Sequence, residues 1–295
     1  MIPAPGAPVL FRMGILAVVA AGALPVRARA QDSVASKSVV IPVYPSAAPA
    51  PFGPGERLTY NVKIGWFGVG KAQMTVEGID TLDGHVTYHA RMTIKGGLGP
   101  ARVNDDSESW FDITDFASWR FLQKIHEVNY RSYRDYRMHP DLGMWDRADN
   151  DESGPLASLL PLDDISFVYF LRTLPMEVGK TYTYNRYFKA DGNPVIVKVV
   201  RRAVRKEDSG TYQTVVVKPV IQTRGLFSEG GKAELYFTDD DRRILVYLKS
   251  DLKGFPGSLT LHLASIHEGL PLNPASRAAA LARRDSMQAD TARSR

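Results

Sequence analysis

The feature that most constrains the fold of this chain is an alternation of apolar and polar residues that recurs along most of its length. In the first such segment, Leu58, Tyr60 and Val62 fall on one face of an extended strand, whereas Thr59 and Asn61 fall on the other. A period of two with β-branched and aromatic residues is typical of a strand that is buried on one side. The same pattern recurs at 70–79, 85–95, 107–113, 120–127, 182–188, 194–201, 212–221, 232–237, 244–252 and 258–266.

Short turn sequences separate these segments. Asp83-Gly84, Asp191-Gly192, Ser209-Gly210 and Gly230-Gly231 are pairs that favour tight turns. Strands joined by tight turns pair antiparallel with their neighbours. The sequence therefore predicts a mainly β fold of antiparallel curved sheets or half-barrels in one domain.

One segment, residues 162–174, departs from the alternation. It lies between Pro161 and Pro175 and carries Asp163 and Asp164 near its start. Acidic residues stabilise the first turn of a helix, and proline is common at helix boundaries. We therefore predict a single central helix in this segment.

The sequences on the two sides of this segment resemble each other. Residues 55–61 (GERLTYN) parallel residues 179–185 (GKTYTYN), and each half later contains a similar corner, at 110–115 and at 235–239. Either an internal duplication or the small vocabulary of β-strands explains the likeness. Under the first explanation, two similar halves pack around the central helix.

The N-terminus has the layout of a secretory signal peptide. Arg12 precedes an apolar core at 13–24, and Ala28-Arg29-Ala30 is typical of a cleavage site. The apolar core is too short to cross a bilayer, so we expect no transmembrane span in the mature form. The expected location is outside the cytoplasm, in the periplasm or the cell envelope. The predicted organisation is a signal peptide (1–30), a proline- and alanine-rich linker (31–54), a β domain (55–272) and an alanine- and arginine-rich tail that is disordered or helical (273–295).

The charge of the chain does not favour a nucleic-acid partner. The formal net charge is +5, but the excess lies in the first 30 residues and in the tail. Residues 31–274 hold 29 basic and 30 acidic residues, and a nearly neutral body has no broad attraction for a polyanion. The chain also contains no cysteine, which excludes disulfides, cysteine metal ligands and a cysteine nucleophile.

Three motifs together resemble the bacterial domain-of-unknown-function family DUF3108. They are GERLTY at 55–60, LDDISFVYFLR at 162–172 followed by Gly179, and FTDDDRRI at 237–244. The resemblance covers about residues 53–270. It implies an exported or envelope-associated protein of mainly β structure, similar in outline to the curved sheets of lipoprotein-carrier proteins. It implies no activity and no catalytic residue.

Few residues form a chemical motif. The sequence has no Gly-x-Ser-x-Gly elbow and no phosphate-binding loop, and His85 and His89 would lie about 13 Å apart on a strand. We therefore predict no catalytic residue, no metal site and no cofactor. A hydrolase acting on carbohydrates stays an alternative, because its two carboxylates need no fixed spacing. The conceivable partners are Glu108, Asp112, Glu127, Glu234 and Asp239.

The leading hypothesis is a non-enzymatic ligand-binding or scaffold β domain. Its ligand would be lipid-like or a glycan, or its partner would be another envelope protein. Aromatic rings and cations bind sugars and anionic head groups, so the candidate ligand-binding residues are Trp66, Trp110, Tyr130 and Arg134. A structural assembly component is the third hypothesis, and it predicts an exposed sheet edge or apolar patch without a cavity.

Overall fold

The computed structural model describes residues 50–98, 101–127, 130–221, 233–251, 258–275, 277–279 and 282. The predicted signal peptide, the linker up to residue 49 and most of the predicted tail lie outside the described residues. Among the described residues, no helix is long and apolar enough to cross a membrane.

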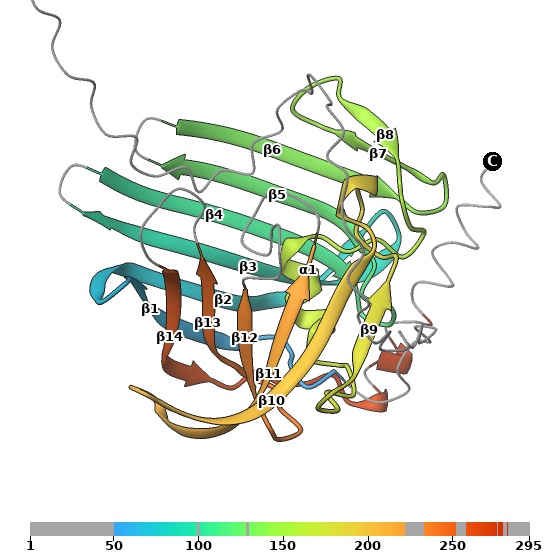
Figure 1. Ribbon diagram of the computed structural model, residues 1–295. Helices are drawn as coiled ribbons and strands as arrows, with labels where there is room; N and C mark the ends of the chain where they lie inside the picture. The colour runs from blue at the N-terminus through green and yellow to red at the C-terminus, as the bar shows by residue number, and fades with distance from the viewer. Residues whose placement is uncertain are drawn as a thin grey trace, which may run out of the picture.

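The strands within these residues form one 14-stranded antiparallel sheet that curves around the helix α1 (Asp164–Leu171) (Figure 1). The prediction of a mainly β, antiparallel, curved fold in one domain is therefore confirmed, and the sheet is continuous. Its strands are β1 (Arg57–Ile64), β2 (Phe67–Leu82), β3 (His85–Leu98), β4 (Ala101–Asp112), β5 (Ser118–Glu127), β6 (Tyr130–His139), β7 (Met144–Arg147), β8 (Ser153–Pro155), β9 (Thr181–Tyr184), β10 (Val195–Glu207), β11 (Gly210–Val220), β12 (Glu234–Thr238), β13 (Leu245–Asp251) and β14 (Ser258–His267). A short 3-10 helix, η1 (Ala190–Gly192), precedes β10.

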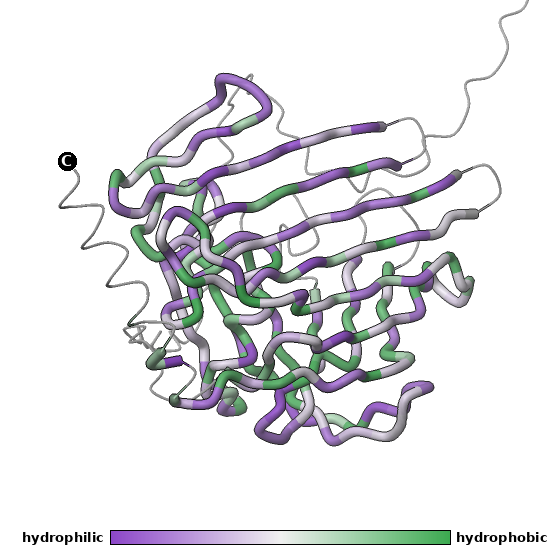
Figure 2. Tube along the Cα trace, turned by 180° about the vertical axis from the view of Figure 1, so that it is seen from behind, coloured by the Kyte–Doolittle hydropathy of each residue, from purple (hydrophilic) through white to green (hydrophobic). Residues whose placement is uncertain are grey.

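Two meanders make up this sheet. β1 to β8 follow one another from the middle of the sheet to one edge, and β14 back to β9 run from the middle to the other edge. The meanders join where β1 pairs antiparallel with β14, from Arg57 opposite His267 to Ile64 opposite Leu259. Apolar and polar residues alternate along the long strands (Figure 2). This alternation gives each strand one face for the core and one for solvent.

The segments that repeat in the sequence occupy equivalent places in the two meanders. Gly55, just before β1, has φ +89°, and Gly179, just before β9, has φ +87°. The Gly55 amide donates to Val76 (2.8 Å), and the Gly179 amide donates to Val199 in the same way (2.8 Å). Left-handed backbone explains why glycine stands at both places. The two meanders thus begin with the same local structure.

The helix α1 is buried all round, as its continuous apolar sequence requires. It begins two residues later than predicted because Asp163 is its N-cap, with extended backbone and a side chain that accepts from the amides of Ile165 and Ser166. It packs on the inner face of the sheet, where the ring of Tyr169 lies 5.6 Å from that of Phe111 on β4. The helix therefore fills the concave side of the sheet.

The core of the described residues includes side chains that precede β1, the first strand in the chain. Phe52 is 1% exposed, and its ring lies 4.7 Å from that of Tyr169. Glu56, also buried, pairs with Arg172 at the end of α1. Residues 50–56 therefore close one side of the space around the helix.

Candidate functional site

The β10–β11 hairpin bends over the outer face of the sheet. Although β11, β12 and β13 lie between β10 and β14 in the sheet, the turn of the hairpin contacts β14 directly. The amide and hydroxyl of Ser209 both donate to the carbonyl of Leu263, at 3.4 and 2.9 Å. The side-chain Nδ2 of Asn61 on β1 donates to Oδ2 of Asp208 (2.6 Å). The hairpin turn is thus fixed to the junction between the two meanders.

A line of bonded side chains lies beneath this hairpin. The guanidinium of Arg205 lies 3.7 Å from the ring centroid of Tyr247 and donates to Oε1 of Glu207 from Nε (3.0 Å) and Nη2 (2.5 Å). Oε2 of Glu207 lies 2.9 Å from Nδ1 of His262. Burial raises the pKa of Glu207, but the hydrogen bonds from His262 and Arg205 outweigh that effect and hold the pKa below its usual value. Glu207 is therefore an ionised carboxylate with both oxygens engaged.

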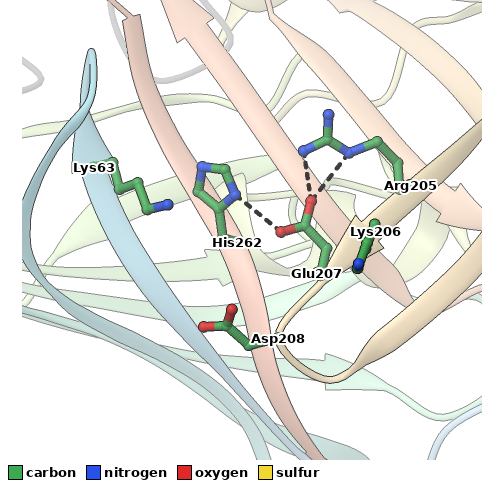
Figure 3. Close-up of a pocket in the computed structure, with 6 residues that line it drawn as sticks. All are labelled: Lys63, Arg205, Lys206, Glu207, Asp208 and His262. Atoms are coloured by element: carbon green, nitrogen blue, oxygen red, sulfur yellow. Dashed lines mark hydrogen bonds and ion pairs between the residues drawn. The ribbon is translucent and has the colours of Figure 1, made fainter.

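A pocket of about 350 Å³ opens between this hairpin and strands β1 and β14 (Figure 3). Its acids are already bonded, Glu207 to Arg205 and His262, and Asp208 to Asn61. Lys63 is half-buried and Lys206 is exposed, and neither forms an ion pair within the described part of the chain. Because Arg205 and Glu207 both turn toward the sheet, alternation turns Lys206 away from it. Lys63 therefore supplies the unpaired ammonium group that faces the pocket. Its lining residues are Lys63, Arg205, Lys206, Glu207, Asp208 and His262.

The structure brings two of the four predicted ligand-binding residues together. Arg134 donates to the hydroxyl of Tyr130 (3.0 Å) on β6, and both share the strand face of the buried Tyr136. Trp110 precedes the buried Phe111 by one position and so faces the other way. There it stacks on His89 at 4.3 Å and donates to Asp80 (2.9 Å).

The fourth candidate, Trp66, lies in the turn between β1 and β2 and is 85% exposed. None of the four candidates lines the polar pocket. The pocket side chains come from β1, β10, β14 and a hairpin turn, so no local spacing in the sequence links them. Alternation places Lys63 and His262 on outer faces, and that is the one sequence signal that points to them.

The acids considered for hydrolysis occupy separate places. Glu127 is buried and is a hydrogen-bond partner of Asp105, whose pKa burial raises. The other four bind nearby groups: Glu108 with His89 (2.8 Å), Asp112 with the amide of Thr114 (2.7 Å), Glu234 with Lys218 (2.9 Å) and Asp239 with Arg202 (2.6 Å). No group of three or more His, Asp or Glu side chains within the described ranges could hold a metal ion.

Comparison with known proteins identifies a family. Among solved structures, the chain is similar to a "putative lipoprotein" from Parabacteroides distasonis, with 10% identity and a TM-score of 0.33 over 75% of this chain and 100% of that one. No curated protein matches the chain. The model of the family described as "Protein of unknown function (DUF3108)" matches residues 59–264, as the sequence motifs predict. Because this match spans more than half of the chain, the protein belongs to the DUF3108 family.

Proposed function

We propose that the protein is an exported, non-enzymatic binding protein of the cell envelope, and that the pocket beside the β10–β11 hairpin binds an acidic glycan. The observation that carries this proposal is the half-buried ammonium of Lys63, which faces a pocket whose two carboxylates are already bonded. The signal-like N-terminus and the family resemblance support the envelope location.

An anionic ligand accounts for the charges of the pocket. A half-buried ammonium is more stable beside a counter-ion, and within the described residues no carboxylate fills that role for Lys63. A carboxylate of the ligand would contact the ammonium group of Lys63. Such a charge-assisted contact is stronger than one between neutral groups.

The polar lining favours a sugar over an acyl chain. Every residue that lines the pocket carries a charged or titratable side chain. An alkyl chain would displace water from these charged groups without offering them any hydrogen bond, whereas the hydroxyls of a sugar can both donate and accept. The volume of about 350 Å³ falls at the small end of ligand pockets, which suits one or two sugar rings.

The state of Glu207 supports binding rather than hydrolysis. A glycosidase needs one protonated carboxyl and a second carboxylate across the scissile bond. Glu207 is held ionised by His262 and Arg205, so it is a poor proton donor near neutral pH. We therefore assign it the role of orienting Arg205 and His262.

Calorimetric titration with two matched ligands tests the proposal. We expect digalacturonate to bind and neutral digalactose to bind about tenfold more weakly or not at all, because only the former carries a carboxylate. Lys63→Gln should remove most of this preference. Lys198→Gln, an exposed lysine on β10 outside the pocket, is the matched control and should bind as the parent does.

Three outcomes would contradict the proposal. Equal affinity for the two sugars would show that the carboxylate of the ligand does not contribute to binding. Unchanged binding by Lys63→Gln would show that the ligand binds outside this pocket. If the protein released reducing ends from an acidic oligosaccharide and a heat-denatured sample did not, the protein would be an enzyme, and the proposal of a non-enzymatic binding protein would be wrong.

A further inference from the structure

The turn between β1 and β2 presents two aromatic rings to solvent. Trp66 is 85% exposed, Phe67 is 58% exposed, and their ring centroids lie 5.7 Å apart. Scattered apolar residues are normal on a protein surface, but tryptophan is usually buried over most of its area. An adjacent tryptophan and phenylalanine at the tip of a turn therefore point to a surface that is covered in use.

The backbone holds this turn in place. Gly65 adopts φ +58°, a left-handed conformation that suits glycine, and its amide donates to the carbonyl of Ser258 on β14 (3.1 Å). The last pair of the β1–β2 ladder, Ile64 with Phe67, directly flanks the turn. The two rings thus project from a fixed end of the sheet.

Three lysines lie on the outer face of the sheet behind the turn. Lys63 is three residues before Trp66, Lys71 is four residues after Phe67, and Lys95 is the cross-strand neighbour of Lys71 on β3. None of the three lysines forms an ion pair with a described residue. The end of the sheet that carries the exposed rings therefore also carries unpaired positive charge.

We propose that the Trp66–Phe67 turn docks on an anionic lipid surface, with the two rings at the lipid–water interface and Lys63, Lys71 and Lys95 close to the head groups. Tryptophan prefers this interface because its ring is apolar and its N–H is polar. Each lysine near an anionic surface strengthens binding about fivefold. Two rings are too small an area for a stable protein interface, which buries about 800 Å² per partner.

This docking surface is distinct from the proposed ligand pocket, although Lys63 belongs to both. The test therefore uses Lys71 and Lys95, neither of which lines the pocket. Loss of lipid binding in such variants says nothing about the glycan, and loss of glycan binding in Lys63→Gln says nothing about the turn.

Co-sedimentation of the mature chain, recovered after export, with vesicles tests the proposal. We expect binding to phosphatidylcholine vesicles that contain about 30% phosphatidylglycerol, and much weaker binding to vesicles of phosphatidylcholine alone. Trp66→Ala with Phe67→Ala should weaken binding about tenfold or more, because two apolar rings no longer enter the interface. Lys71→Gln with Lys95→Gln should weaken it about 25-fold at low salt.

Leu142→Ala is the matched control. Leu142 is 70% exposed and lies in the turn between β6 and β7, at the opposite end of the strands. Its substitution should leave vesicle binding unchanged. Far-UV circular dichroism should show that every variant folds, since all the substituted side chains are at least partly exposed.

Tryptophan fluorescence gives an independent readout. Vesicles should shift the emission of the parent chain to shorter wavelength, and Trp66→Phe should abolish the shift while it keeps most of the binding. Three results would overturn the proposal: full binding by the double alanine variant, a shift that persists in Trp66→Phe, or a parent chain that ignores the vesicles but forms a dimer lost in the double alanine variant.

Discussion

At the scale of single residues, a buried ion pair links two distant parts of the sequence. Arg172 at the end of α1 donates to Glu56 through Nη1 (2.5 Å) and Nη2 (2.9 Å), and Nη2 also donates to the carbonyls of Pro51 (3.2 Å) and Arg242 (3.0 Å). Glu56, Arg172 and Arg242 belong to the three motifs that carry the family resemblance. The three motifs thus meet at one place in the fold.

Removing one partner of this pair should be strongly destabilising. Arg172→Met leaves the carboxylate of Glu56 buried without a counter-ion, and we expect a loss of about 3–5 kcal/mol in the free energy of unfolding. Urea denaturation measures this loss. Arg242→Met is the control, because Arg242 pairs with Asp240 and Glu268 near solvent, and it should lose about 1 kcal/mol or less. Equal losses in the two variants would contradict the role of burial.

Asp164, in the first turn of α1, makes stability depend on pH. Burial raises its pKa to about 6, and the nearby Asp163 acts in the same direction. In the unfolded chain the pKa is about 3.9, so between these values the native state holds the extra proton. The stability from this residue is therefore present in acid and lost as the pH rises through 6.

Asp164→Asn should remove this dependence. We expect the variant to gain about 1–2 kcal/mol over the parent at pH 7.5 and much less at pH 4.5, allowing for the partial exposure of the side chain. Urea denaturation at the two pH values gives the difference. A gain that is the same at both pH values, or larger in acid, would rule out an elevated pKa at this residue.

At the scale of elements, the glycines of β2 and β3 mark a close approach of two strands. Gly70 and Gly96 are direct cross-strand neighbours, and a methyl group on Gly70 would lie 2.3 Å from the carbonyl oxygen of Lys95. The register between β1 and β2 also shifts at this point, between Val62 and Lys63. Gly70 and Gly96 therefore mark a β-bulge and a tight strand pair.

Gly70→Ala should disturb this pair. We expect a loss of about 1–3 kcal/mol, because the added methyl group meets backbone atoms that cannot move away easily. Gly78→Ala on the same strand is the matched control, since a methyl group there meets no atom within 4 Å. Its stability should change little, or rise by about 0.5 kcal/mol. Thermal denaturation of both variants tests the difference, and a Gly70→Ala protein as stable as Gly78→Ala would refute the close approach.

The sequence predicts helices and strands well where neighbouring residues alone determine them. Alternation predicts the long strands except β6, which is not among the predicted segments, and the acidic residues and prolines around residues 162–174 predict α1. The short strands β7 and β8 have no alternating pattern long enough to predict them; β7 pairs with β6, and β8 pairs with β7. Element ends also differ, since β2 and β10 extend beyond the predicted 70–79 and 194–201.

At the scale of the whole molecule, patterns in the sequence do not predict contacts between segments that lie far apart in the chain. Tight turns fix which consecutive strands pair, but they do not predict that β1 pairs with β14, some 200 residues later in the chain. They also do not predict that the β10–β11 hairpin bends across the outer face. Lys63 and His262 line one pocket only because β1 pairs with β14 and the hairpin bends over both strands. Alternation in the sequence places each residue on an outer face but does not predict that they lie together.

The continuous sheet makes a prediction about cooperativity. All four tryptophans, Trp66, Trp110, Trp119 and Trp145, lie in the first meander or its turns, whereas circular dichroism reports on both meanders. Because β1 pairs with β14 and α1 packs inside the shared curve, we expect both signals to change in one coincident transition. Two separately stable units would instead give two midpoints.

A substitution in the meander that holds no tryptophan makes this test sharper. Leu235 on β12 is fully buried in the second meander, and Leu235→Ala should lose about 2–5 kcal/mol. If the sheet unfolds as one unit, the tryptophan fluorescence of the first meander must shift its midpoint by as much as the circular dichroism does. A fluorescence midpoint that stays in place while the dichroism midpoint falls would show that the β1–β14 pairing joins two independent units. A common shift would mean that the loss of one leucine in the second meander destabilises the first through that single pair of strands and the helix beside it.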